Sequence, residues 1–329
     1  MMNHLGGTGV RLRQLNFELL RTVLRESPQG ATKQTLSRKT GLSLATCGTL
    51  LTALVENGEA VELARVESGG GRPALLYGSN RKIAVSALLY LEFADGIGGL
   101  TGCTANAAGE VLTRETMHRG VIEAETVANA LEQLTLRDPR IRSAAVSFPG
   151  AVSGTVTELL REQFPFPVVL DHEMNFAAAG YVESVPALRN ATVCLVNFPP
   201  KRFPRAGIAV DGSVLHGRSG FAGELSFLPF GISREQQKLR LGNRAGLTGQ
   251  IAETVAALAA VLNPLQVVLC GGEIEESMRP ALQKLCRELI PAEHLPELVF
   301  RDGCREECLR GMAVTAMNAL APPVRLVGR

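Results

Sequence analysis

Residues 32–58 constrain the fold of this chain more than any other part of the sequence. Their apolar residues are spaced as in two short helices that pack together across a tight turn. Gly41 stands where the first helix must end, because glycine enters the left-handed backbone conformation without steric cost. Ser43 follows at a position where its hydroxyl can cap the second helix. The pattern predicts a helix-turn-helix.

The flanking sequence extends this motif into a winged helix-turn-helix. A helical apolar pattern over 11–25 precedes it, and strand-like runs over 60–66 and 74–77 follow. The glycines at 69–71 suit the tip of a wing, and a flexible linker beginning at Ser68 is the alternative. Residues 1–82 carry eleven Lys and Arg against six Glu and no Asp, a net charge of +5, whereas the rest of the chain carries −3. A basic head of this kind is typical of a domain that binds a polyanion.

The predicted head offers two sets of side chains to double-stranded DNA. Small polar and methyl-bearing groups on the second helix of the motif can reach base edges in the major groove, and they are Ser43, Ala45, Thr46 and Thr49. Groups suited to phosphate contacts are Lys33, Gln34, Arg38 and, on the wing, Arg72. Because a single head of this size binds weakly, we expect a homodimer or a higher homo-oligomer on an operator with two half-sites.

From residue 80 onward, short strand-like runs alternate with predicted helices. This alternation predicts an α/β architecture with mixed sheets. We expect a winged helix-turn-helix domain over 1–79 and a second domain over 80–329, with lobes of approximately 80–185 and 186–329. The last predicted helix, 306–320, is a candidate for returning to the first lobe.

The composition indicates a cytoplasmic protein. The seven cysteines are an odd, scattered set within apolar runs, which is typical of reduced, buried thiols and not of a disulfide framework or a metal site. The N-terminus lacks the apolar core of a signal peptide, and no apolar run looks long enough to span a membrane. We therefore expect no membrane contact, no metal and no cofactor.

Four motifs lie in order along the second domain. The longest is AGIAVDGSVLHGRSGFAGELSFLP at 206–229, and the others lie at 147–152, 170–175 and 263–272. In type and order they resemble the motifs of the ROK family, which comprises repressors, open reading frames and kinases. The resemblance implies the two-lobed actin-like ATPase fold of sugar kinases. The winged helix in front, with its Gly-Gly-Arg-Pro wing, resembles what the ROK repressors add to that fold.

The chain departs from the family where a ROK kinase binds phosphate. Residues 92–100 lack the Asp-x-Gly-Gly-Thr of the first phosphate turn, and 201–205 reads Lys-Arg-Phe-Pro-Arg where the second turn is rich in glycine. Side chains there block the close approach of backbone N–H groups to phosphate. Residues 228–242 contain neither cysteine nor histidine, so the family's zinc motif is missing. These departures predict that the domain has no catalytic residues and binds no zinc.

Three residues at family motif positions remain candidates for binding a sugar or sugar-phosphate effector: His172, Glu173 and Glu224. Glu173 replaces the family's catalytic Asp, and a structural hydrogen bond at a helix start is the alternative role. For Glu224, the alternative is bracing the loop at 220–223. The sequence thus predicts a transcriptional regulator, of the repressor kind, with an inactive ROK domain. An active sugar kinase with a DNA-binding head and a scaffold whose winged helix binds protein are the alternatives.

Overall fold

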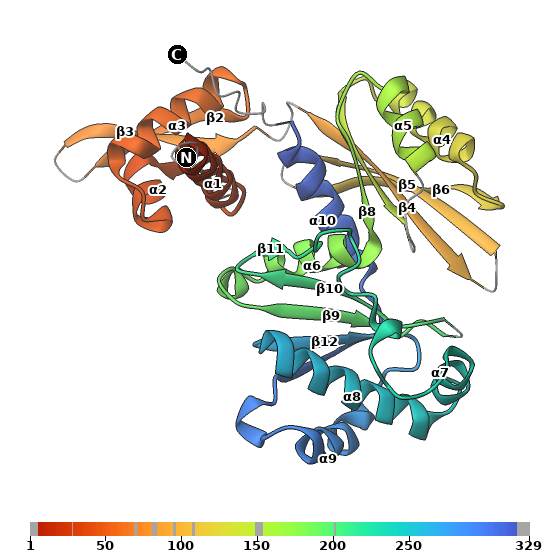
Figure 1. Ribbon diagram of the computed structural model, residues 1–329. Helices are drawn as coiled ribbons and strands as arrows, with labels where there is room; N and C mark the ends of the chain where they lie inside the picture. The colour runs from red at the N-terminus through yellow and green to blue at the C-terminus, as the bar shows by residue number, and fades with distance from the viewer. Residues whose placement is uncertain are drawn as a thin grey trace.

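The computed structural model describes residues 6–320 apart from Pro28, 69–70, 81–83, 95–96, 107–108, 149–153 and Lys201. A small head lies beside the first of two lobes, and the second lobe lies below the first (Figure 1). Each lobe is built on one five-stranded sheet, whereas the head has a three-stranded sheet. The chain is therefore α/β in class, as predicted.

The head confirms the predicted winged helix-turn-helix. Its elements are α1 (Gly6–Arg25), β1 (Ala31–Thr32), α2 (Lys33–Thr40), α3 (Leu44–Glu56), β2 (Ala60–Ser68) and β3 (Gly71–Ser79). Gly41 ends α2 with a φ of 71°, in the left-handed region that favours glycine. The Ser43 hydroxyl accepts a hydrogen bond from the Thr46 N–H and so caps α3. The head has its own apolar core, which includes Leu20, Leu36 and Leu51.

The first lobe consists of three antiparallel strands joined to two parallel ones. Its elements are β4 (Val85–Ala94), β5 (Ile97–Asn106), β6 (Val111–Gly120), α4 (Ala124–Arg137), β7 (Ile141–Phe148), α5 (Gly154–Gln163), β8 (Val168–His172) and α6 (Glu173–Ser184). The strand order is β6-β5-β4-β7-β8. Strands β4, β5 and β6 pair antiparallel, and β4, β7 and β8 pair parallel.

The second lobe repeats this topology. Its elements are β9 (Val193–Asn197), β10 (Arg205–Val210), β11 (Ser213–Val214), α7 (Arg234–Leu241), α8 (Arg244–Leu262), β12 (Gln266–Cys270), α9 (Arg279–Leu289), β13 (Glu297–Arg301) and α10 (Arg305–Asn318). The order β11-β10-β9-β12-β13 and the strand directions match those of the first lobe. By this correspondence α10 is the equivalent of α6, since each follows the last strand of its sheet.

The sequence analysis predicted no helix at α5 or α7 and no strand at β8 or β13. Helix α7 buries only Gln237, so it has no apolar stripe to reveal its period. Strand β13 has five residues at the edge of its sheet, and only Leu298 is fully buried. Both elements are defined by their packing against neighbours and not by a local pattern.

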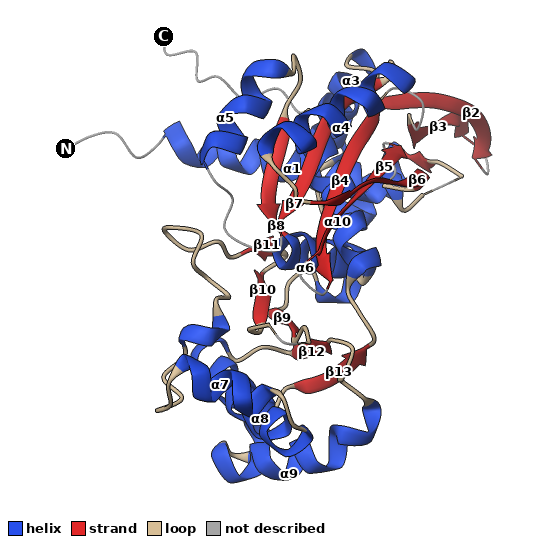
Figure 2. Ribbon diagram, turned by 90° about the vertical axis from the view of Figure 1, so that its right-hand side faces the viewer, coloured by secondary structure: helices blue, strands red, loops and turns tan. Residues whose placement is uncertain are grey.

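The two lobes meet through α6 and α10, which lie between the two sheets (Figure 2). Helix α10 packs against β4 and β7 of the first lobe, and α6 packs against β9 and β10 of the second. Where the helices cross, a Cβ atom on Gly180 would overlap the carbonyl oxygen of Glu307, and one on Gly311 would overlap that of Phe176. Only glycine fits at these two positions, because the opposing atoms belong to backbone that cannot rotate away.

Helix α8 is long and apolar enough to cross a membrane by length and composition, which the sequence analysis did not anticipate. Half of its apolar window is buried inside the second lobe. Ile251, Val255 and Leu258 on this helix belong to the core that also contains β9, β10 and β12. Such burial is typical of the core helix of a lobe.

The substitution Gly311→Ala tests the close crossing of α6 and α10. We expect it to lower the free energy of unfolding by about 3 kcal/mol or more, because the added methyl group must displace backbone. Chemical denaturation in urea, followed by circular dichroism, measures the change. The matched control is Gly48→Ala in α3, where no atom lies within 4 Å of the added Cβ. The control should instead gain about 1 kcal/mol from helix propensity. Equal effects of the two substitutions would contradict the close crossing.

Candidate functional site

The head presents an open face on α3. Ser43, Ala45 and Thr49 are exposed and Thr46 is half-buried, while Cys47, Leu50 and Leu54 point into the core of the head. The hydroxyl of Thr49 donates to the carbonyl oxygen of Ala45, and the hydroxyls of Ser43 and Thr46 lie 2.8 Å apart. These hydroxyls are thus held by their own helix, and their outer surfaces remain accessible to a ligand.

The predicted phosphate-binding residues are placed less uniformly. Gln34 and Arg38 are exposed on α2. The ammonium group of Lys33 lies 5.6 Å from the centre of the Tyr77 ring, against the head's own sheet. The side chain of Arg72 lies outside the described residues. Of these four, Gln34 and Arg38 are the ones that the structure places on the open side of the motif.

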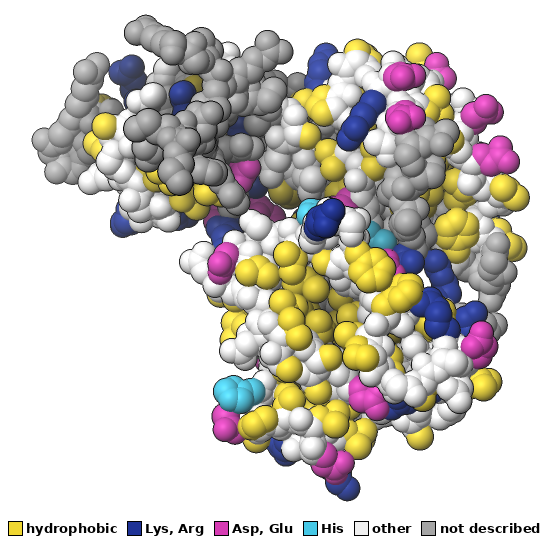
Figure 3. Space-filling view, viewed as in Figure 1, with side chains coloured by type: hydrophobic (Ala, Val, Ile, Leu, Met, Phe, Trp, Pro, Cys, Tyr) yellow, Lys and Arg dark blue, Asp and Glu magenta, His cyan; other side chains and the backbone are white. Residues whose placement is uncertain are grey.

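A second cluster of polar side chains lies where the two lobes meet. Figure 3 shows histidine, cationic and acidic side chains gathered between the lobes. His172 caps the start of α6, and its Nδ1 accepts a hydrogen bond from the N–H of Met174 at 3.1 Å. Nη1 of Arg205 lies 2.6 Å from Nε2 of the same ring, and Nε of Arg205 lies 3.5 Å from Oε2 of Glu224. Arg205 therefore links two of the three predicted effector-binding residues.

Burial shifts the pKa values of His172 and Glu173, at the start of α6, in opposite directions. It lowers the pKa of His172 to about 4, and the nearby Arg205 cation adds to this effect. It raises the pKa of Glu173 to about 7, against the opposing influence of Arg202, Arg205 and a hydrogen bond with Asn197. His172 is therefore neutral at pH 7. Since both of its ring nitrogens face N–H donors and a neutral ring has one N–H, it can accept only one of the two hydrogen bonds.

The structure adds Asp171 and His216 to the cluster, and the sequence analysis did not select either of them. Oδ1 of Asp171 accepts hydrogen bonds from the His172 N–H and the Asn175 amide, each at 2.7 Å. Oδ2 of Asp171 lies 2.7 Å from Nε2 of His216, and this hydrogen bond raises the pKa of His216. Asp171 lies in the motif at 170–175 and His216 in the motif at 206–229, and 45 positions separate them along the chain. Only the fold brings them together.

Helix α10 starts on the other side of the same region. The guanidinium of Arg305 lies 5.0 Å from the centre of the Tyr90 ring, and its Nη2 donates to the hydroxyl of Thr101 at 2.9 Å. Nη1 of Arg305 lies 3.7 Å from Oε2 of Glu92. Burial raises the pKa of Tyr90, and the charge of Glu173 adds to the effect. Sγ of Cys304, the residue before α10, lies 3.6 Å from Sδ of Met174 in the first turn of α6, so the two helices start side by side.

An open cavity of about 300 Å³ adjoins these residues along β5. It is lined by Glu92, Ile97, Gly98, Gly99, Leu100, Thr101, Thr116 and Arg119. Its walls offer carboxylate, hydroxyl and guanidinium groups, which suit a small polar molecule with several hydroxyl groups. Among the described residues, no group of three or more His, Cys, Asp or Glu side chains could hold a metal ion. All seven cysteines are free thiols, and six of them are buried.

The raised pKa of Glu173 predicts a pH-dependent effect of Glu173→Gln. The folded chain binds the Glu173 proton more tightly than the unfolded chain, so this carboxyl costs stability as the pH rises from 4.5 to about 7. Over that range, the Gln variant should gain about 2–3 kcal/mol in unfolding free energy relative to the unsubstituted protein. Urea titrations at several pH values measure the difference.

His172 has the opposite pH dependence, because its pKa is lowered on folding, but it is present in both proteins and cancels in the comparison. Exposed Glu132→Gln is the control, and a pH-independent difference for Glu173→Gln would contradict the raised pKa.

Comparisons with known proteins place this geometry in context. No protein-family model matches the chain. The chain is 25% identical over 245 residues to the xylose repressor of Caldicellulosiruptor bescii, a match that covers 67% of this chain and 59% of that protein. The matched region therefore spans less than two thirds of the repressor's length.

Two solved structures bear on the architecture. A ROK family transcriptional regulator, described as a homologue of the E. coli MLC protein, aligns with a TM-score of 0.68 at 17% identity and covers 94% of this chain and 98% of its own. The ROK hexokinase from Thermus thermophilus aligns with a TM-score of 0.55 at 21% identity and covers 70% of this chain and 98% of its own. The two lobes thus have the actin-like ATPase fold of ROK proteins. The chain is thus similar in sequence to a xylose repressor and in fold to a ROK family transcriptional regulator.

Proposed function

We propose that this protein is a DNA-binding transcriptional repressor that carries a ROK domain without kinase activity. The observation that carries the proposal is the head itself, with the exposed face of α3 opposite a buried core. The solved ROK regulator matches nearly the whole chain, whereas the hexokinase matches 70% of it. A chain with the regulator's full architecture is suited to a regulator's role.

The DNA-binding role follows from the surfaces of α2 and α3. Helix α3 offers small side chains that let its backbone approach base edges in the major groove. Thr49 exposes a methyl group that can contact the methyl group of thymine. Gln34 and Arg38 on α2 are exposed and suited to phosphate. We infer an operator of two half-sites and a homodimer, because each head alone makes few contacts.

The region around Arg205 supports the proposed absence of kinase activity. A kinase of this fold needs backbone N–H groups close to the nucleotide phosphates. Here the side chain of Arg205 lies between His172 and Glu224, and Pro204 is buried beside it. Glu173 stands where the family's kinases have a catalytic Asp, and its additional methylene would move the carboxylate by about a bond length. We infer that these lobes bind a ligand and do not transfer phosphate.

The proposed effector is a sugar or a sugar phosphate. His172, Glu173 and Glu224 supply imidazole and carboxylate groups, and Arg205 supplies a cation that could hold a phosphate. Mixed donors and acceptors of this kind suit a ligand with many hydroxyl groups. Xylose is the first sugar to test, because the curated relative is named a xylose repressor. A regulator of this kind would act in the cytoplasm.

Fluorescence anisotropy with DNA from upstream of the protein's own coding region tests the head. We expect Arg38→Ala to reduce the slope of log affinity against log salt by about one, because one phosphate contact is lost. Thr49→Ala should weaken binding to the preferred fragment about tenfold, and it should leave binding to an unrelated fragment unchanged. Arg287→Ala, which removes an exposed cation from α9, is the matched control. If the unsubstituted protein binds neither fragment at low salt, the DNA-binding role is wrong.

A direct assay tests the absence of kinase activity. We expect no sugar-dependent release of ADP when the protein is mixed with ATP, Mg²⁺ and either glucose or xylose. Coupled-enzyme detection of ADP measures this release. Sugar-dependent ADP release that disappears in Glu173→Gln would overturn the proposal and establish the kinase alternative.

A further inference from the structure

Two ion pairs join the head to the body, one between the ends of α1 and α6 and one just beyond these ends. Nη2 of Arg25 lies 3.1 Å from Oε1 of Glu183, and the two side chains are only 10% and 21% exposed. Next to them, Arg189 of the body forms an ion pair with Glu26 of the head. In the first pair the head supplies the cation, and in the second it supplies the anion. We call these four residues the junction clamp.

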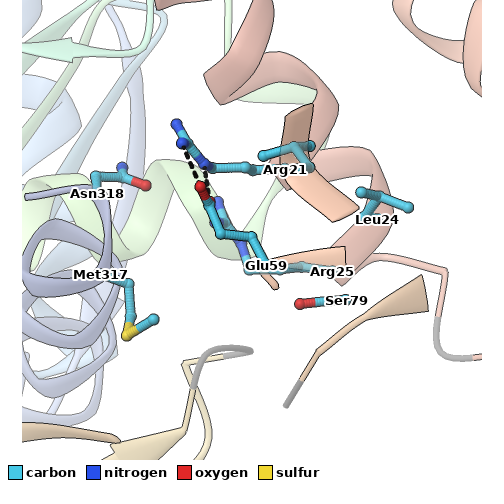
Figure 4. Close-up of a pocket in the computed structure, with 8 residues that line it drawn as sticks. Arg21, Leu24, Arg25, Glu59, Ser79, Met317 and Asn318 are labelled. Carbon is cyan, nitrogen blue, oxygen red and sulfur yellow. Dashed lines mark hydrogen bonds and ion pairs between the residues drawn. The ribbon is translucent and has the colours of Figure 1, made fainter. Parts of the chain in front are cut away.

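The end of α10 also reaches the head. A small pocket between them is lined by Arg21, Leu24, Arg25, Leu54, Glu59 and Ser79 of the head and by Met317 and Asn318 of α10 (Figure 4). Arg21 and Glu59 form an ion pair of 2.7 Å at this pocket. Oδ1 of Asn318 is buried without a hydrogen-bond partner among the described atoms. The contact between the head and α10 is thus more polar than the apolar cores of the head and the lobes, and it leaves a pocket and one buried oxygen without a hydrogen bond among the described atoms.

The two helices that end at the head are the two that begin at the polar cluster between the lobes. Helix α6 runs from Glu173 to the clamp residue Glu183, a rise of about 15 Å. Helix α10 runs from Arg305 to Met317, a rise of about 18 Å. One end of each helix therefore lies at the polar cluster, and the other end lies at the head.

The crossing at Gly180 and Gly311 leaves these helices little room to move separately. Each glycine lies against the backbone of the other helix, so a shift of one helix must displace its partner. The head, in contrast, has a closed core of its own, drawn from residues 17–77. It can move as a unit when its polar contacts with the body change.

We propose that α6 and α10 form a rigid pair that couples the polar cluster between the lobes to the position of the head. In this proposal, the junction clamp transmits a movement of the two helices to the head. The inference deepens the proposed function, because it assigns a route by which an effector between the lobes would change DNA binding. A ligand that moves the start of either helix would strain or release the clamp, and the spacing of the two heads in a dimer would change with it.

The test is a double-substitution cycle between the two ends of the pair. Arg305→Ala removes the contacts of α10 with Glu92 and Thr101, and Glu183→Arg breaks the clamp by placing two arginines together. The sites share no partner, so independent effects would multiply. Arg137→Glu, which disrupts an exposed ion pair with Glu115, is the matched control. The charge swap Arg25→Glu/Glu183→Arg should restore the clamp.

The first measurement needs no DNA. Amide hydrogen exchange of residues 20–26 in the whole protein reports how tightly the head is held. We expect Arg305→Ala to raise this exchange at least threefold, and Glu183→Arg to raise it by more. In the double variant, the exchange rate of residues 20–26 should be less than about 1.5 times that of Glu183→Arg alone. The reason is that Glu183→Arg already disconnects the head from the two helices. The charge swap should return it close to the original rate, and Arg137→Glu should leave it unchanged.

The coupling is wrong if Arg305→Ala leaves exchange in 20–26 unchanged, or if the effects of the two substitutions multiply. The same variants are then compared on the preferred DNA fragment by anisotropy. Failure of the unsubstituted protein to bind any DNA would overturn the proposed function, while the exchange data would still decide the coupling. Normal DNA binding with multiplied exchange effects would overturn the coupling alone.

Discussion

The contact between α6 and α10 at Gly180 and Gly311 is the constraint on which the rest of the structure depends. Each lobe ends in one of these helices, and each helix packs against the sheet of the other lobe. The distance between the lobes is therefore set by how closely two backbones can approach. Because the helices start side by side, with Sγ of Cys304 3.6 Å from Sδ of Met174, residues from both lobes face one polar region.

In the proposed function, the polar cluster is a ligand site on a sugar-kinase fold that does not transfer phosphate. Arg205 lies between His172 and Glu224, in the region where a kinase would use glycine backbone to bind phosphate. Burial keeps His172 neutral and leaves Glu173 partly protonated near pH 7. Groups in these states donate and accept hydrogen bonds well, and a carboxyl with a pKa near 7 could also serve as a base. Phosphate transfer is therefore opposed by the side chains at the second phosphate turn and not by the pKa of Glu173. Recognition and catalysis thus make different demands on the same positions.

The head was predictable because its signals are local. Gly41 and Ser43 act through their own backbone and nearest neighbours, so their meaning can be read without the fold. The duplicated lobes were not predictable in this way, since their shared topology leaves no repeated pattern in the sequence. The cluster was found in part: His172, Glu173 and Glu224 came from family motifs, whereas Arg205, Asp171 and His216 acquire their roles only from contacts across the fold.

The sequence by itself determined the two kinds of domain, the turn and caps of the head, and the absence of glycine where a kinase would bind phosphate. These properties depend on residue type and short spacing, which folding does not change. Only the tertiary structure decided which polar groups meet, how burial shifts their pKa values, and that Glu183 and Arg25 join the body to the head. Those outcomes depend on distances between residues far apart in the chain, and such distances are fixed only when the helices pack.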